Sequence, residues 1–206
     1  MNLYKALGGG ISMTKRELAM VEEIAKNISF LAGEDVRSKF MEGSEKIGKA
    51  SNEEVAIWVK GAISKLDSLV KPETRNEIMA SCGHNCAQAH ESTIENARKK
   101  RQKYKSLDDF LTAEEKKPGR ASRIERRGNV VYHYFTPGSY GQGVRCFCGL
   151  LKGLPNDQTV SRTYCQCSRG FVEEIWEAYL GKKPQVEVMQ SAVSGAKECK
   201  FAVHLT

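Results

Sequence analysis

Apolar residues recur at helical spacing through the first half of the chain. Val21, Ile24 and Ile28 share one face of a helix, and Gly33 is a natural end for it. Ser51 and Glu54 form a capping-box pattern, in which each side chain bonds the backbone amide of the other residue. We therefore expect helices over four stretches: 14–31, 34–47, from Ser51 to Leu66, and from Pro72 to about residue 92.

The pattern changes after Gly128. Residues 130–135 are β-branched or aromatic, which favours a strand, and 137–143 has the composition of a long turn before a second strand at 144–148. We expect these two strands to pair antiparallel. An apolar helical stripe then ends at Gly181, and strands at 186–189 and 199–205 are joined by a turn at Ser194 and Gly195.

These patterns predict an α+β fold that forms one integrated domain. A helical region spans 1–96, and an α+β region spans 130–206, with the helices packed on an antiparallel sheet. Between them, 97–129 has few large apolar residues, so we expect a polar, basic surface excursion with one short helix that begins at Ser106.

The formal charge of +7 lies largely in that middle section, where acidic residues are interspersed. A solvated surface is the favoured interpretation, and a patch that binds nucleic acid is the less favoured one. No stretch approaches the length of apolar residues that spans a membrane, and the N-terminus has no apolar leader, so we expect a cytoplasmic protein.

Six of the seven cysteines occur in three short pairs, and clustered thiols in a reducing compartment suggest a metal. Zinc is the leading expectation, and an iron–sulfur cluster is the alternative. Two further interpretations stay open: cysteines as small buried apolar residues, and a catalytic or redox thiol. The candidate ligands are Cys82, Cys86, Cys146, Cys148, Cys165 and Cys167, with Cys199 and His90 as weaker candidates.

Geometry limits how each pair can act. On a helix, Cys82 and Cys86 share a face that continues to His90, whereas His84 points away from it. Cysteines two apart on a strand are widely spaced, so Cys146 and Cys148 need a strand end or a turn to bind one metal together. We therefore expect one ligand, and not always two, from each pair.

The last forty residues carry a further pattern. Cys165 stands five residues before Gly170, Gly170 stands eleven before Gly181, and Ser191 and Gly195 precede Cys199. In this spacing the segment resembles the 4-vinyl reductase domain, a ligand-binding module of bacterial sensors of aromatic compounds that is related to Golgi transport-particle subunits. It also looks like a cysteine-rich bacterial and archaeal branch related to that domain.

The resemblance implies a pocket between the helices and the sheet for an apolar or aromatic molecule, and a possible homodimer. In the sensor branch, three cysteines and a glutamate bind a structural zinc, and Cys165 and Cys199 fall on two of those positions. Ser191 stands in place of the third cysteine, and Val188 stands at the carboxylate position. The candidate pocket residues are Tyr134, Phe135, Phe147, Phe171, Ile175, Trp176 and Tyr179.

The sequence thus favours a small-molecule-binding or sensory domain with a cysteine metal site, more than an enzyme. A metal-dependent hydrolase or an iron–sulfur redox protein is the first alternative. A nucleic-acid-binding module that uses the basic middle section is the second.

Overall fold

The computed structural model describes residues 14–140 and 145–205. Its helices are α1 (Lys15–Ala32), α2 (Glu34–Met41), α3 (Asn52–Leu69), α4 (Pro72–Gln88), α5 (Glu91–Arg101), α6 (Leu107–Lys116) and α7 (Gln166–Leu180). Short 3-10 segments are η1 (Ser44–Lys49), η2 (Pro137–Tyr140), η3 (Gly149–Leu151), η4 (Arg162–Cys165) and η5 (Ala192–Ser194). The strands are β1 (Ser122–Arg127), β2 (Val130–Phe135), β3 (Gln185–Gln190) and β4 (Cys199–His204).

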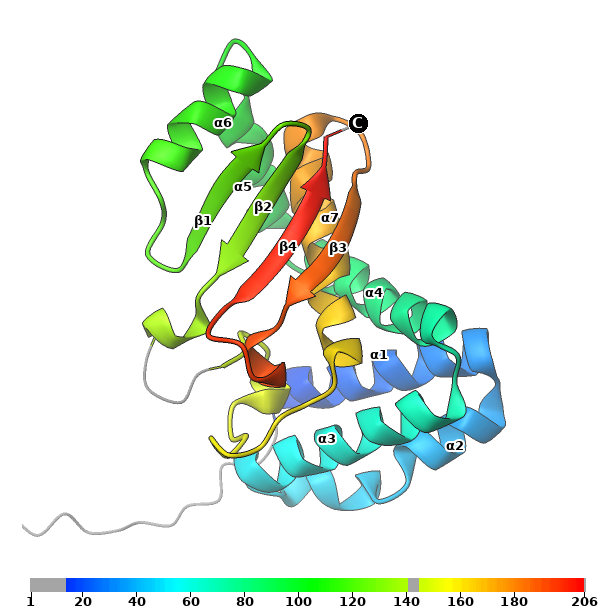
Figure 1. Cartoon of the computed structure of the whole chain (residues 1–206). Coiled ribbons are helices and arrows are strands. Elements are labelled where there is room, and N and C mark those ends of the chain that lie inside the picture. The colour runs from blue at the N-terminus through cyan, green and yellow to red at the C-terminus, as the bar shows by residue number, and fades with distance from the viewer. Residues whose placement is uncertain (1–13, 141–144, 206) are drawn as a thin grey trace, which may run out of the picture.

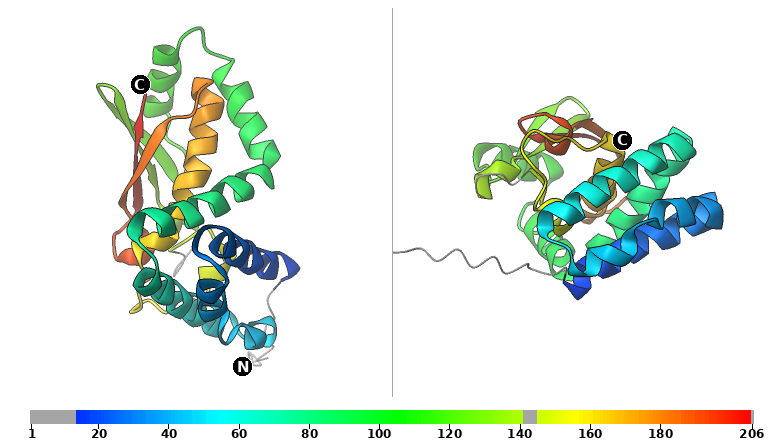
Figure 2. Two further views of the ribbon diagram at one scale, coloured as in Figure 1. Left: turned by 90° about the vertical axis from the view of Figure 1, so that its right-hand side faces the viewer. Right: turned by 90° about the horizontal axis from the view of Figure 1, so that it is seen from below.

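The predicted α+β fold is confirmed. The strands form one antiparallel sheet in the order β1-β2-β4-β3, and α7 packs along one face of it (Figure 1). Helices α1 to α4 lie at one end of the layer pair that the sheet and α7 form, as the side view shows (Figure 2). Within residues 14–140 and 145–205, no helix combines the length and the apolar character that crossing a bilayer requires.

Local signals set several helix ends as expected. Ser51 accepts a bond from the backbone amide of Glu54, whose side chain bonds back to Ser51, and α3 begins there. Gly181 ends α7 with a φ of 75°, a left-handed conformation that glycine adopts at little cost. The second predicted helix is shorter than expected, because α2 ends at Met41 and a 3-10 segment follows.

Two strand predictions are wrong. The partners of β2 are β1 and β4, and residues 145–148 form no strand, while Val144 lies outside the described residues, as does the 141–143 part of the predicted turn. The region 97–129 supplies the edge strand β1, so it is more than a surface excursion. The sequence pattern did not predict β1 because its residues, Ser-Arg-Ile-Glu-Arg-Arg, include one apolar side chain, Ile124. They therefore show no alternation of apolar and polar positions.

Helices α4 and α7 cross at very short backbone distance. A Cβ atom built on Gly83 would lie 1.9 Å from the backbone oxygen of Cys167, and one on Gly170 would lie 2.1 Å from that of Ala80. Only glycine at both positions lets the two backbones approach this closely. The crossing brings the cysteines of α4 next to the cysteines at the start of α7.

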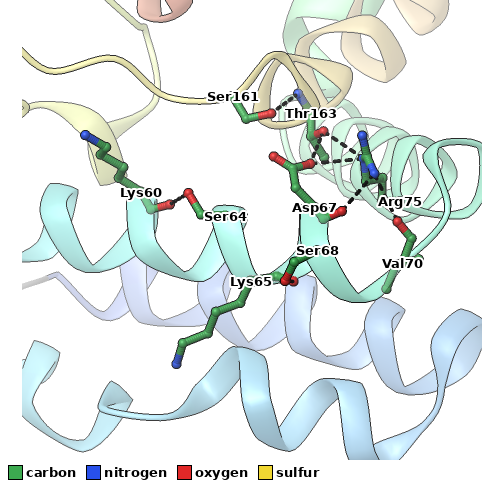
Figure 3. A network of polar contacts seen from close by, with 9 residues as sticks. All are labelled: Lys60, Ser64, Lys65, Asp67, Ser68, Val70, Arg75, Ser161 and Thr163. Atoms are coloured by element: carbon green, nitrogen blue, oxygen red, sulfur yellow. Dashed lines mark hydrogen bonds and ion pairs between the residues drawn. The ribbon is translucent and has the colours of Figure 1, made fainter.

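A polar network holds η4, the segment that leads into α7. Arg75 lies 3.0 Å from the carboxylate of Asp67, and the hydroxyl of Thr163 donates to the same carboxylate at 2.6 Å (Figure 3). Arg75 also donates to the backbone oxygens of Asp67 and Val70, which the end of α3 leaves without helical partners. Helices α3 and α4 thereby hold η4, the turn that carries Tyr164 and Cys165.

Candidate functional site: a cavity lined by thiols

One cavity gathers most of the cysteines, and we call it the thiol cavity. It has a volume of about 630 Å³ and lies between the start of α1, the end of α4, the 145–149 loop, the start of α7 and the ends of β2 and β4. Its thiol lining consists of Cys86, Cys146, Cys148, Cys165, Cys167 and Cys199. A smaller space of about 250 Å³ shares Cys86, Cys148 and Cys167 with it and adds Cys82.

The seven cysteines are free thiols, and their pKa values are raised. Burial raises the pKa of Cys82 and Cys165 to about 12, and it raises those of Cys146 and Cys167 well above the ordinary value. A thiol with so high a pKa stays protonated near neutral pH. The cavity wall is therefore uncharged where the cysteines form it.

The cysteines lie close enough to influence one another. After burial, the negative charge that Cys148, Cys165 and Cys199 carry when they ionise raises the pKa of Cys146 further. Cys167 is affected in the same way by Cys148, Cys82, Cys86 and Cys146. Cys146 is thus linked both to Cys148, whose backbone amide donates to its sulfur at 3.4 Å, and to Cys165 and Cys199, which line the same cavity.

The zinc ligand set that the resemblance implies is incomplete. The sulfur of Cys165 lies 2.7 Å from the hydroxyl oxygen of Ser191, and the amide of Ala192 donates to the sulfur of Cys199 at 3.4 Å. Val188, at the carboxylate position, is a buried apolar residue, and Glu187 lies on the opposite strand face. Among the described residues, no three His, Cys, Asp or Glu side chains are arranged to hold a metal ion.

His90 does not serve Cys86 as a base in this arrangement. Its Nδ1 lies 2.7 Å from the carbonyl oxygen of Cys86, which can only accept, so Nδ1 carries the proton. The other ring nitrogen accepts from Arg16. Although Cys86 sulfur is 3.8 Å from Nδ1, that nitrogen has no free lone pair to take a proton. His84 points away, toward Glu173 and Glu174 of α7.

The predicted pocket residues divide into two sets. Phe135, Phe147 and Phe171 line the thiol cavity. Tyr134, Ile175, Trp176 and Tyr179 do not, since Trp176 donates to buried His133, and Tyr179 packs on Phe110. Arg123 lies over the ring of Tyr134, 3.9 Å from its centre, on the other face of the sheet.

Sequence reasoning missed the other lining residues that matter here, which are Arg16, Arg145, Tyr164, Ser168 and Phe201. Tyr164 donates to the sulfur of Cys148 at 2.9 Å and so ties η4 to the 145–149 loop. Tyr164 and Ser168 directly flank the cysteine pair 165 and 167 in the sequence, and this position could have indicated that they line the same site. Nothing local distinguishes the two arginines from surface residues.

Much of the basic charge of the middle section is paired locally. Lys99 pairs with Glu95, and Lys100 with Glu114. Arg126 pairs with Asp108. Such pairs reduce the charge that this surface offers to a polyanion.

The comparisons with known proteins give a family. The model of a family of unknown function, DUF6144, matches residues 14–206, so the chain belongs to that family. No curated protein matches the chain in sequence.

Three solved structures share a distant likeness. The Fe(II) unliganded H-NOX protein from K. algicida has a TM-score of 0.43 and 11% identity, over 90% of this chain and 94% of that one. A mutant H-NOX protein from S. oneidensis in the Fe(II) state also scores 0.43 at 11% identity, over 91% and 94%. The S. oneidensis protein in the Fe(II)NO state scores 0.40 at 10% identity, over 91% and 98%. A likeness this distant indicates neither a ligand nor a function.

Proposed function

We propose that this member of the DUF6144 family is a small-molecule-binding, sensory-type domain, whose thiol cavity holds an apolar or aromatic molecule. One observation carries the proposal. Six cysteines and the rings of Phe135, Phe147, Phe171 and Phe201 line a single cavity of about 630 Å³. That volume is within the range of small-molecule sites, whose walls are mostly apolar with a few polar groups.

The state of the thiols supports binding more than chemistry. Protonated thiols are soft, polarisable and nearly apolar, so they favour aromatic and aliphatic groups. A nucleophilic cysteine needs a lowered pKa or a base, and Cys86, the cysteine nearest a histidine ring, has a raised pKa and no accepting nitrogen. The resemblance of 165–205 to the 4-vinyl reductase domain also implies a pocket between helices and sheet, and the thiol cavity is bounded by helices and by the ends of β2 and β4.

A neutral probe tests this proposal. We expect 2-naphthalenemethanol to bind the purified protein in ligand-observed NMR and calorimetry. Replacing Ser168 on the cavity wall with phenylalanine fills part of the space, so S168F weakens binding by about tenfold or more. The matched control is S64F on the exposed side of α3, which leaves affinity unchanged. Equal binding by S168F refutes the proposal, and so does a wild type that binds neither this alcohol nor the corresponding acid, 2-naphthoate.

A metal site is our second proposal, with zinc as the metal and an iron–sulfur cluster as the alternative. The observation in its favour is that Cys146, Cys165 and Cys199 line one wall of the same cavity. Cys146 offers the third thiol that Ser191 does not supply. Among the described residues, no group of three or more His, Cys, Asp or Glu side chains is arranged to hold a metal ion. The three thiols therefore have to move closer together when they bind the metal.

Elemental analysis tests the metal directly. The protein is purified under reducing, chelator-free conditions, and the expected result is one zinc per chain in the wild type and a loss of zinc in C146S. An absorption band at about 400 nm after anaerobic purification points to iron–sulfur instead. If the wild type carries neither metal, this second proposal is wrong, whereas the cavity proposal is unaffected.

A further inference from the structure

The wall of the thiol cavity carries positive charge that the described residues leave unpaired. From this we infer that the ligand is an organic acid, in which an apolar or aromatic body carries one carboxylate group. The inference rests on the proposed function, because it concerns the same cavity. It adds the charge of the ligand and the side chains that recognise it.

Arg145 is the first source of that charge. Its guanidinium donates to the backbone oxygen of Gln158 at 2.7 Å and to that of Pro155 at 2.5 Å. These carbonyl dipoles fix the side chain but do not neutralise it. The buried Nε–H has no hydrogen-bond partner, and among residues 14–140 and 145–205 no carboxylate lies within ion-pairing distance of Arg145. A partly buried, uncompensated guanidinium favours an anion.

Arg16 is the second source, on the first turn of α1. Among the described residues, it contacts a ring nitrogen of His90 and forms no ion pair. The one carboxylate on the wall, Glu17, is already committed to the start of α1. It accepts from the backbone amide of Thr14 at 2.8 Å and from the hydroxyl of Thr14 at 2.9 Å. The cavity wall therefore has two cations and one carboxylate, which leaves a net charge of +1.

The remainder of the wall sets the body of the ligand. The cysteine thiols are uncharged, and Phe135, Phe147, Phe171 and Phe201 present aromatic surface. A small inorganic anion leaves this surface uncovered, and a neutral hydrocarbon leaves the arginines unpaired. A molecule with an aromatic body and a single carboxylate satisfies both, because the carboxylate pairs with the positive charge of Arg16 and Arg145 while the body covers the aromatic wall.

The experiment compares 2-naphthoate with its neutral counterpart 2-naphthalenemethanol by calorimetry on the full chain. We expect the acid to bind about tenfold or more tightly than the alcohol. Raising the salt from about 0.05 M to about 0.5 M weakens the binding of the acid and leaves that of the alcohol unchanged. The preference for the acid falls in R16Q, whereas R37Q, which changes a half-buried arginine on α2 away from the cavity, retains it.

The outcomes separate the two claims. If both probes bind with equal affinity, the organic-acid inference is overturned and the proposed function stands. If neither binds, the proposed function fails and the inference fails with it. An acid preference that survives both in R16Q and in R145Q, which removes the charge of Arg145, overturns the assignment to these arginines. R16Q changes an exposed side chain, so folding does not obscure its result.

Discussion

The crossing of α4 and α7 gives a sharp prediction about stability. Alanine at Gly83 or Gly170 places a Cβ atom 1.9 or 2.1 Å from a backbone oxygen of the other helix, where contacts below 3.0 Å essentially never occur. Backbone oxygens cannot rotate aside as a side chain can. The two helices must therefore separate by about 1 Å, which loosens the packing along the whole contact.

Two effects oppose each other in these variants. Alanine is favoured over glycine inside a helix by about 1 kcal/mol. Forcing extra volume into a packed contact costs about 1–3 kcal/mol and sometimes more. Because the atoms here are backbone, we take a packing cost of about 3 kcal/mol, the upper end of that range. The gain in helix propensity offsets about 1 kcal/mol of it, so we expect G83A and G170A each to lose about 2 kcal/mol of unfolding free energy.

Urea unfolding followed by circular dichroism measures this loss. The control is G61A, on the exposed side of α3, where an added Cβ atom meets nothing within 4 Å. It should gain about 0.5–1 kcal/mol from helix propensity alone. The double variant G83A/G170A should lose less than the sum of the single losses, because one separation of the helices relieves both contacts. If G83A and G170A are as stable as the wild type while G61A behaves as expected, the close crossing is refuted.

Three further predictions concern a buried histidine, the thiols and a helix cap. Burial lowers the pKa of His133 from 6.5 to about 3, and Trp176 donates to its Nδ1, so the imidazole is neutral in the folded protein. The unfolded chain binds this proton first as the pH falls, so the stability that neutral His133 contributes is complete above pH 6.5 and decreases by about 1.4 kcal/mol per pH unit toward pH 3. An NMR titration should find no protonation of His133 in the folded state between about pH 5 and 8, and a midpoint near 6.5 contradicts this. Because a pKa of about 12 makes the thiolate of Cys165 about a thousandfold rarer than that of an exposed thiol, iodoacetamide at neutral pH should label Cys165 slowly until urea unfolds the chain. Equal labelling rates in the folded and unfolded protein, read by mass spectrometry, exclude this burial. Finally, S51A should lose about 1 kcal/mol in thermal or urea unfolding because the amide of Glu54 loses its acceptor, and S51D should retain most of the stability; equal losses in both variants contradict a capping role.

The sequence by itself determined the elements that depend on nearby residues. The capping box at Ser51 and the left-handed glycine at Gly181 act within four positions along the chain, so their patterns predicted the start of α3 and the end of α7. The α+β class followed from the change in hydrophobic period near Gly128. The face alternation of β3, with Val188 buried and Glu187 exposed, was also readable from the sequence.

Strand partners were decided by the tertiary structure. The edge strand β1 has polar residues on its open face and one apolar residue, Ile124, so it left no alternating pattern to read. The sequence Val130–Phe135 predicted a strand correctly but not its neighbours. Pairing depends on which edges the rest of the fold leaves free, and a local pattern does not contain that information.

The cysteine pairs show the same division at the site. Their spacing identified the residues as a group, but a spacing does not say where the sulfurs point. The glycine contacts between α4 and α7 bring Cys86 and Cys167 to one cavity, and the return of β4 beside β2 brings Cys199 to it. Arg16 and Arg145 are separated by more than half of the chain and carry no shared motif. Only chain folding places these side chains on one wall, because packing joins residues by distance in space and a sequence pattern joins them by distance along the chain.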